Sequence, residues 1–564
     1  MRRFRAVPAS TRPLLVIVVC ATAAGLSAVA FMLATHAIFA ATMERFAEGS
    51  LVGFAWKSLL TITVSSLAVG LLLYRISPQA AGSGIPQLKV AFWKDLGFLP
   101  FRISLVKFVA GALSIGGGSS LGREGPSAFI AGGVASALGG RLGVFKASRR
   151  GVTSAGSAAG LAAAFNTPMA SIGFLVEEII GDLNTRYLGG AALAAVMGAF
   201  AVHAVIGPQP SFLLPVVQAN TWTMYMVVPV VASLAALLGI AFQRATLRWR
   251  MVFRGQTKVP AWALPVFGGW ITWILGIAAF HATGRVGVFG LGYHDLSDAL
   301  TGAVPWSAAV LLVLCKLVAT VACYSAGGCG GIFAPTLFLG GLTGAAVAGF
   351  ASLSLPLAEA DQIILAAVGM SACFGAVVQA PLTALLIVFE MTHQFQLVPA
   401  LIMATVISQA IARRGGGHNF YDALLEQDGH ELMKIKPPRD LGSWRNLPVS
   451  VVANRRPVAI PGLDREGLRR LLVTTPYQSY PVEHDGKPIG IVTRKAIQQA
   501  VTTGSEPPVD PVVTVFPAQT IHEASQQFIR STQGLIVVVD PDSGRMTGIL
   551  TLHDLLRAQA AVQE

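Results

Sequence analysis

Charged residues are scarce in this chain of 564 amino acids. Asp, Glu, Lys and Arg make up only 12% of it, whereas hydrophobic residues make up 53%. Soluble domains carry about 25% charged residues, so the composition argues against a soluble enzyme and predicts a polytopic α-helical membrane protein. Apolar stretches recur from Leu14 to Ile411, and polar residues gather later. We therefore expect a membrane domain at residues 1–430, a linker at 431–445 and a soluble tail at 446–564.

Cysteine is also rare, and the chain lacks the motifs of common enzymes. The five cysteines have no C-x-x-C spacing and lie in apolar segments: Cys20, Cys315, Cys323, Cys329 and Cys373. This pattern is typical of packed small side chains rather than of a disulfide framework or a metal site. No H-E-x-x-H, G-x-S-x-G or phosphate-loop pattern is present. We expect neither an enzyme nor a bound metal.

Nucleic-acid binding is not indicated by the net charge of +13, because no basic–aromatic module is present. The basic residues lie in short segments beside apolar runs: Arg2, Arg3, Arg5, Arg12, Lys146, Arg149, Arg150, Arg244, Arg248, Arg250, Arg254, Arg413 and Arg414. This positive-inside pattern predicts a cytoplasmic N-terminus and a cytoplasmic tail at the cell (inner) membrane. The first apolar run, Leu14 to Thr42, is too long for a signal-peptide core, so we expect a retained helix.

Glycine and proline interrupt many of the apolar stretches, which makes them shorter than a clean span. Five interruptions stand out: Gly116–Gly118, Gly122–Pro126, Asn166–Pro168, Gly327–Pro335 and Gln379–Pro381. Broken helices at membrane depth persist only where the exposed backbone lines a cavity or is buried in protein. Any single break could be an ordinary kink, but together they favour functional breaks.

An internal repeat relates these breaks. The segment from Gly122 to Gly132 aligns with that from Gly331 to Gly341 at an offset of 209 residues. Asn166-Thr-Pro168 and Glu177 align with Gln379-Ala-Pro381 and Glu390 at an offset of 213. The membrane domain is therefore predicted to be a duplicated unit, with halves at roughly 50–210 and 260–412. Repeat-built transporters place their binding site between the repeats.

The glycine-rich segments are candidate anion sites. They are Gly82–Pro86, Gly122–Pro126 and Gly330–Pro335, each placed to begin a helix with free backbone N–H groups. Arg123 and Glu124 lie inside one of them, although a charge costs about 2.5–3.5 kcal/mol at the centre of a membrane helix. A carboxylate beside an anion site competes with the anion, because two negative charges about 4 Å apart repel by about 4 kcal/mol. Anion occupancy and protonation of Glu124 would then be linked.

Two further acids, Glu177 and Glu178, follow the apolar run Met169–Val176. Adjacent residues point in different directions on a helix, so one is expected to be structural and the other to be available as a second proton site. The spacing alone does not decide between them.

These motifs, in this order, resemble those of the CLC chloride channel and transporter family. The resemblance covers roughly residues 15–430 and rests on Gly82–Pro86, Gly122–Pro126, Gly331–Pro335 and Tyr421-Asp422, with Lys107-Phe108 and Ala162–Asn166 in support. It implies an inverted-repeat fold of many tilted and partial helices, assembled as a homodimer in the lipid bilayer.

By match of motif, the resemblance also implies roles for single residues. Chloride would be held by the Ser83 and Tyr421 hydroxyls and the Ile332 and Phe333 amides, with an outer site at the amides of Arg123–Gly125. Glu124 would be the external gating and proton-accepting acid, and Glu178 the internal proton site. Ser83 accompanies chloride preference in the family, and an acid at Glu178 is typical of exchangers. The implied function is chloride/proton antiport, and the alternative is a passive gated chloride channel of the same fold.

The tail carries a second repeat. Gly490–Ala496 resembles Gly548–Asp554, and each segment follows a β-rich run, Ser479–Val482 or Leu535–Val539. The tail resembles a pair of CBS domains, at about 446–503 and 507–564. Such modules bind adenine nucleotides, and the second repeat keeps the matching Thr551 and Asp554, whereas the first has Ala496 in place of the acid. One nucleotide site, or a purely structural tail, is implied.

Overall fold

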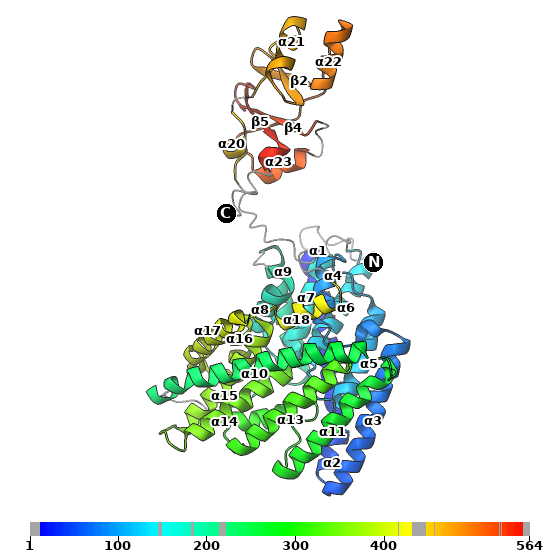
Figure 1. The fold of residues 1–564 in the computed structure, drawn as a ribbon, viewed down its shortest axis with the longest axis vertical. Helices are drawn as coiled ribbons and strands as arrows, with labels where there is room; N and C mark the ends of the chain where they lie inside the picture. The colour runs from blue at the N-terminus through cyan, green and yellow to red at the C-terminus, as the bar shows by residue number, and fades with distance from the viewer. Residues whose placement is uncertain are drawn as a thin grey trace. The chain divides into compact units, whose positions relative to one another are not determined.

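The computed structural model describes residues 12–144, 149–181, 185–212, 214, 221–415, 417–430, 447–455, 457–528, 531 and 533–555. The chain divides into two compact units, a membrane unit of residues 1–437 and a tail unit of residues 438–564 (Figure 1). The predicted linker at 431–445, Lys146, and Arg2, Arg3 and Arg5 lie outside the described residues.

Helices make up the membrane unit. The first half contains α1 (Arg12–Phe39), η2 (Ala40–Glu44), α2 (Arg45–Ala47), α3 (Leu51–Arg75), η3 (Pro78–Ala80), α4 (Ile85–Trp93), α5 (Phe101–Gly116), α6 (Glu124–Arg141), α7 (Arg149–Phe165), α8 (Pro168–Phe174), η5 (Leu175–Ile180) and α9 (Thr185–Val205). The second contains α10 (Trp222–Gly255), η6 (Ala261–Ala263), α11 (Leu264–Thr283), α12 (Tyr293–Leu300), α13 (Trp306–Ser325), α14 (Phe333–Ala351), α15 (Glu359–Val378), α16 (Pro381–Thr392), η7 (Phe395–Leu397), α17 (Val398–Arg414) and α18 (Phe420–Gln427).

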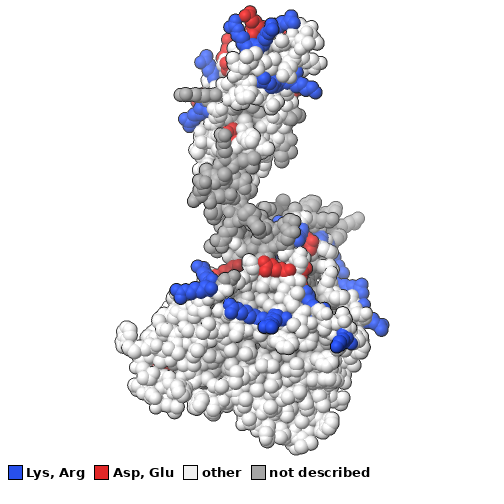
Figure 2. Space-filling model, in the orientation of Figure 1, with Lys and Arg blue, Asp and Glu red and all other residues white. Residues whose placement is uncertain are grey.

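Within the described residues, nine helices are long and apolar enough to cross a membrane. The predicted interruptions coincide with helix boundaries in every case, for example between α5 and α6 and between α7 and α8. In the space-filling view, the surface of the membrane unit is almost free of charged side chains except for a band along one edge (Figure 2). All five cysteines are buried and unpaired, which confirms their prediction as packed side chains.

The two halves of the membrane unit are related by a local twofold axis. Gly122 and its repeat counterpart Gly331 form an antiparallel bridge, in which each amide donates to the other's carbonyl at 2.7 and 2.6 Å. Two equivalent residues that pair in this reciprocal way have chains that run in opposite directions at the contact. Inverted repeats have this relation, which the offset of 209 residues does not reveal.

Buried lysines repeat this symmetry. Lys107 donates to the carbonyls of Ala80 and Gly82 at 2.8 and 2.9 Å. Its counterpart Lys316 donates to Gly287 and Gly290 at 2.8 and 2.7 Å. Each ammonium thereby fixes the loop that precedes a short helix, α4 in one half and α12 in the other, since a buried charge needs such partners.

Glycine permits very close helix packing at α14 and α15. A Cβ atom on Gly369 would lie 2.1 Å from the carbonyl oxygen of Gly340, and one on Gly340 would lie 2.2 Å from that of Gly369. No other residue could occupy either position without separating the helices. Small residues at helix contacts are typical of membrane proteins, where close backbone approach stabilises packing.

The tail unit is an α/β structure with two small sheets. The antiparallel hairpin of β1 (Ser479–His484) and β2 (Lys487–Thr493) packs with α21 (Arg465–Thr474) and α22 (Arg494–Thr503). In the second sheet, β4 (Leu535–Val539) pairs in parallel with β3 (Thr514–Val515) and antiparallel with β5 (Met546–Thr551). Two short helices complete the described tail, α20 (Val449–Val452) and α23 (Ile521–Phe528). The β-rich runs predicted from the sequence correspond to β1 and β4.

Candidate functional site

The side chain of Glu124 reaches the N-terminal end of α14, a helix of the other repeat. Glu124 is the first residue of α6, and its side chain is fully buried. One carboxylate oxygen accepts a hydrogen bond from the Tyr293 hydroxyl at 2.5 Å, and the other accepts from the Ala334 amide at 3.4 Å. Because Ala334 lies in the first turn of α14, the carboxylate sits where the dipole of α14 favours a negative charge.

Three helix N-termini converge around this carboxylate. Ser83 lies just before α4 and is buried, and Gly84 begins the helix with a left-handed φ of +89° that favours glycine. A Cβ atom on Gly125 would lie 2.8 Å from the Ser83 carbonyl oxygen, so only glycine allows α6 to come this close. Ile332 and Phe333, at the start of α14, are fully buried.

Tyr421 reaches the same cluster from α18. Its ring lies 6.4 Å from the rings of both Phe174 and Phe333, and the residue is fully buried. Among the described residues its hydroxyl has no hydrogen-bond partner. A buried donor without a partner costs about 1–3 kcal/mol, and an anion at this position would accept its hydrogen bond.

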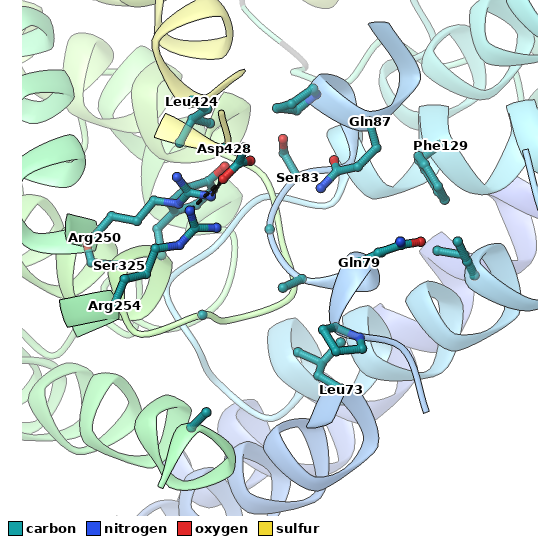
Figure 3. Close-up of a pocket in the computed structure, with 18 of the residues that line it drawn as sticks. Leu73, Gln79, Ser83, Gln87, Phe129, Arg250, Arg254, Ser325, Leu424 and Asp428 are labelled. Carbon is teal, nitrogen blue, oxygen red and sulfur yellow. Dashed lines mark hydrogen bonds and ion pairs between the residues drawn. The ribbon is translucent and has the colours of Figure 1, made fainter. Parts of the chain in front are cut away.

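Two cavities approach the cluster and share no lining residue. One, of about 870 Å³, is lined by Ser83, Tyr324, Arg250, Arg254 and Asp428 among others (Figure 3). In this view Arg250 and Arg254 reach toward Asp428, which they contact at 2.7 and 2.6 Å. The other cavity, of about 1060 Å³, is lined by residues that include Arg123 and Tyr293. Glu124 lines neither cavity and sits beside residues that line the second.

Arg123 lines the second cavity. Its guanidinium lies 5.6 Å from the centre of the Tyr293 ring. This cation–π contact places a positive charge at the cavity wall.

The structure distinguishes the two neighbouring acids, Glu177 and Glu178. Glu177 accepts from the amides of Leu382 and Thr383 at 3.0 and 2.8 Å, which caps α16. Its repeat counterpart Glu390 accepts from the amides of Met169 and Ala170 at 2.9 and 2.6 Å, which caps α8. Glu177 is therefore structural, as one of the pair was expected to be.

Glu178 is buried among polar groups from α4 and α18. One of its oxygens lies 2.5 Å from the Lys89 ammonium, and the other accepts from the Asn419 side chain at 2.9 Å. Lys89 also contacts Asp422 at 2.5 Å. Through Lys89, Glu178 is thus linked to Asp422, the residue that follows Tyr421. Glu178 lies outside the cluster around Glu124.

Sequence reasoning missed Tyr293 and Lys89 as parts of the site. Tyr293 follows Gly292 at the start of α12, as Ile85 follows Gly84 at the start of α4. Extending the internal repeat to these short helices would have brought Tyr293 into view. Lys89 lies inside a short apolar helix, where a charged residue is itself a signal of function.

In the tail, Thr551 and Asp554 contact each other. The Asp554 carboxylate accepts from the Thr551 amide and hydroxyl at 2.9 and 2.6 Å. The two residues thus lie side by side after β5, as their sequence motif requires.

Comparison with known proteins gives two family matches. The sequence model described as voltage gated chloride channel matches residues 65–413, and that of the CBS domain matches residues 508–561. The chain is 30% identical over 425 residues to the H(+)/Cl(-) exchange transporter ClcA of Vibrio parahaemolyticus, covering 73% of this chain and 89% of that protein. It is 29% identical over 431 residues to ClcA of Vibrio campbellii, covering 74% of this chain and 90% of that protein.

Solved structures share the fold. A slow cyanobacterial Cl-/H+ antiporter superposes with a TM-score of 0.66 at 24% identity, covering 74% of this chain and 97% of that one. A eukaryotic CLC transporter superposes with a TM-score of 0.61 at 20% identity, covering 96% of this chain and 98% of that one. The inverted repeats, the buried helix ends and the matched sequence agree: the chain belongs to the voltage-gated chloride channel family of membrane proteins and carries a CBS domain toward its C-terminus.

Proposed function

We propose that this protein exchanges chloride for protons across a membrane. The observation that carries the proposal is the contact of the Glu124 carboxylate with the Ala334 amide at the start of α14. A carboxylate that rests on a helix N-terminus stands in for the anion that this end would otherwise bind. The ClcA relatives, which are named as exchange transporters, support the same function.

Chloride would be bound by neutral donors. In our proposal these are the hydroxyls of Ser83 and Tyr421 and the amides of Ile332 and Phe333, with an outer position at the amides of Arg123 and Gly125. Two observations support this assignment: the Tyr421 hydroxyl has no hydrogen-bond partner in the described part of the chain, and the start of α14 is buried. Neutral donors suit a permeant ion, because a full positive charge would bind it too tightly for release.

Glu124 would alternate between two states. When ionised, it holds the N-terminus of α14 and excludes chloride, since the two negative charges would repel by about 4 kcal/mol at about 4 Å. When protonated, Glu124 is neutral and no longer competes with chloride for the Ala334 amide, so chloride can enter. Each chloride that displaces the side chain thereby favours uptake of a proton, which couples the two ions. Glu178, on the side of Tyr421 opposite to Glu124, would supply or accept the proton.

The remaining assignments belong to the same proposal. The protein would work as a homodimer in the cell membrane, with its N-terminus and tail in the cytoplasm. Arg250 and Arg254, which line the same cavity as Ser83, would lie on the cytoplasmic side. The tail would bind an adenine nucleotide at Thr551 and Asp554. The membrane unit would act by transport alone, without an enzymatic reaction.

Glu124→Gln in liposomes tests the exchange. The side-chain amide of this variant cannot ionise, so it should neither compete with chloride for the anion site nor carry a proton. Simultaneous recording of chloride and pH should show that wild-type protein moves protons against their gradient when driven by chloride, and that the variant keeps chloride flux and loses proton movement. If the wild type carries chloride without protons, the protein is a passive channel of the same fold and the antiport proposal is wrong.

A further inference from the structure

Tyr324 places a tyrosine hydroxyl beside Ser83. It lies in the last turn of α13, is 5% exposed and lines the same cavity of about 870 Å³ as Ser83. We refer to this cavity as the Ser83 cavity. The Tyr324 hydroxyl interacts with the side chain and the backbone of Ser83, and a Cβ atom on Gly82 would lie 3.4 Å from the hydroxyl oxygen. The chloride ligands proposed above do not include this hydroxyl.

The backbone near Tyr324 is joined to the loop that carries Ser83. The Gly82 amide donates to the carbonyl of Gly328, which follows the end of α13, at 3.0 Å. The ring of Tyr324 also packs edge-on against Phe420, with 5.4 Å between the ring centres. The end of α13 is thus attached to the loop before α4 on one side and to α18 on the other, which keeps the Tyr324 hydroxyl beside Ser83.

Tyr324 lies on the route from the Ser83 cavity to Tyr421. Ser83, Tyr324 and the next residue, Ser325, all line this cavity (Figure 3). Tyr421 is not among the described residues that line it, and its side chain is fully buried. An anion that moves from the cavity to Tyr421 therefore reaches the hydroxyls of Ser83 and Tyr324 first.

The hydroxyls of Ser83 and Tyr324 have one proton more than the contact between them needs. Each hydroxyl can donate one proton, and the Ser83 oxygen already accepts from the Ile85 amide at 3.4 Å. A hydrogen bond between the two hydroxyls uses one proton and leaves the other without an acceptor in the pair. An anion beside the pair would accept this proton, and it would accept both where it replaces the contact between the hydroxyls.

The arginines of the Ser83 cavity suit a different task. Arg250 and Arg254 contact Asp428 at 2.7 and 2.6 Å, and their side chains are 14% and 48% exposed. A guanidinium in such a cavity attracts anions from solution. Transport also requires that each position release the ion again. A neutral hydroxyl at the inner end of the cavity meets this requirement better than a full positive charge does.

We propose that Tyr324 determines anion specificity, because its hydroxyl donates to the anion, together with that of Ser83, as the ion passes between the Ser83 cavity and Tyr421. The inference rests on the chloride transport proposed above and does not depend on proton coupling. A hydroxyl stabilises a small anion such as chloride more than a large one such as thiocyanate, since the charges come closer together. Tyr324 therefore favours chloride over larger anions.

Tyr324→Phe tests this role, because phenylalanine keeps the ring that packs against Phe420 and removes only the hydroxyl. The loss of a hydrogen bond to an ion weakens binding about tenfold or more. Calorimetric titration of the purified protein should therefore show chloride binding about tenfold weaker in the variant, with a smaller change for thiocyanate. In liposomes the ratio of chloride flux to thiocyanate flux should fall.

Tyr74→Phe is the matched control. Tyr74 lines the same cavity but is 57% exposed, so its variant should match the wild type in affinity and selectivity. Bromide soaked into crystals of the wild-type protein gives a second measurement that needs no variant. We expect an anomalous peak within hydrogen-bonding distance of the Tyr324 hydroxyl, and its absence overturns the inference even if Tyr324→Phe does not fold.

The outcomes separate the two proposals. Wild-type protein that neither binds nor carries chloride overturns the proposed function and this inference with it. A wild type that binds and carries chloride, together with unchanged affinity and selectivity in Tyr324→Phe, overturns the inference alone. Equal loss of affinity for chloride and thiocyanate also overturns it, because a purely structural tyrosine would have that effect.

Discussion

Glu124 is held in place by residues that lie far from it in the sequence. Its carboxylate belongs to the first repeat, whereas Tyr293 and Ala334, which donate to it, begin α12 and α14 of the second. A hydroxyl–carboxylate hydrogen bond at 2.5 Å is short even for a charged acceptor. In the proposed exchange, chloride has to break this contact to displace the side chain.

Tyr293→Phe should release Glu124 from its position. The loss of one hydrogen bond to a charged group is worth about 1.5–3 kcal/mol, so the ionised carboxylate should leave the helix end more readily and chloride flux should rise about tenfold or more. Efflux from liposomes measures this directly. In a Glu124→Gln background the same substitution should have little effect, and an equal rise in both backgrounds would show that Tyr293 acts on something other than the carboxylate.

At the residue scale the sequence predicted the starts of α4, α6 and α14, but neither the start of α12 nor the partners of the acids at the site. Gly82–Pro86 and Gly122–Pro126 could be recognised because their chemistry is local and repeated. The Tyr293–Glu124 hydrogen bond joins residues 169 positions apart, and the Lys89–Glu178 pair joins residues 89 apart. Nothing in the neighbourhood of either acid signals such a contact, which exists only once the helices have packed.

At the scale of elements, the interrupted helices are held together by exchanged caps. Glu177, at the end of one helical run, satisfies the amides at the start of α16, and Glu390 satisfies those at the start of α8. These amides would otherwise be unsatisfied inside the protein. Each half of the membrane unit thus completes the start of one helix, α8 or α16, only in the presence of the other.

Glu177→Gln and Glu390→Gln should each lower stability. Both remove a negative charge from a helix N-terminus, at a cost of about 1–2 kcal/mol. Thermal unfolding in detergent should show a lower midpoint for both variants. Glu426→Gln is the matched control, because the Glu426 side chain is 46% exposed and the variant should unfold close to the wild type. Loss of proton coupling in Glu177→Gln with unchanged stability would contradict the structural role of Glu177.

Contact between α14 and α15 gives another prediction at this scale. Gly369→Ala should separate the two helices, because its Cβ atom would lie 2.1 Å from the Gly340 carbonyl oxygen. We expect a loss of about 2 kcal/mol or more of stability, as for other overpacked sites, seen as a lower unfolding midpoint or a poor yield of folded protein. Gly189→Ala in α9, where a Cβ atom would meet nothing within 4 Å, should unfold like the wild type. Equal behaviour of the two variants would contradict the packing argument.

The breaks between helices could be predicted from the sequence, whereas their mutual arrangement could not. Every interruption marked by glycine or proline coincides with a helix end, because these residues act on the local backbone. The offset of 209 residues indicated duplication only. The opposite direction of the two halves depends on contacts such as the Gly122–Gly331 bridge, which no linear pattern contains.

At the scale of the whole molecule, a transport unit is joined to a unit that carries a CBS domain. We expect an adenine nucleotide such as ATP to raise the unfolding midpoint of the tail in a concentration-dependent way, as any ligand of the native state does. Asp554→Ala should abolish this shift, and Asp542→Ala, in the exposed turn after β4, should preserve it. Absence of a shift at millimolar nucleotide would indicate that the tail is structural.

The exchange of caps between Glu177 and Glu390 has an evolutionary consequence. Before the gene was duplicated and fused, a single half could have supplied both glutamates and both helix starts by pairing with an identical, upside-down copy of itself. Such an ancestor must have entered the bilayer in both orientations. Fusion would then have fixed the two orientations and left each copy free to diverge, so that one acquired the acid Glu124 and the other the tyrosine that holds it.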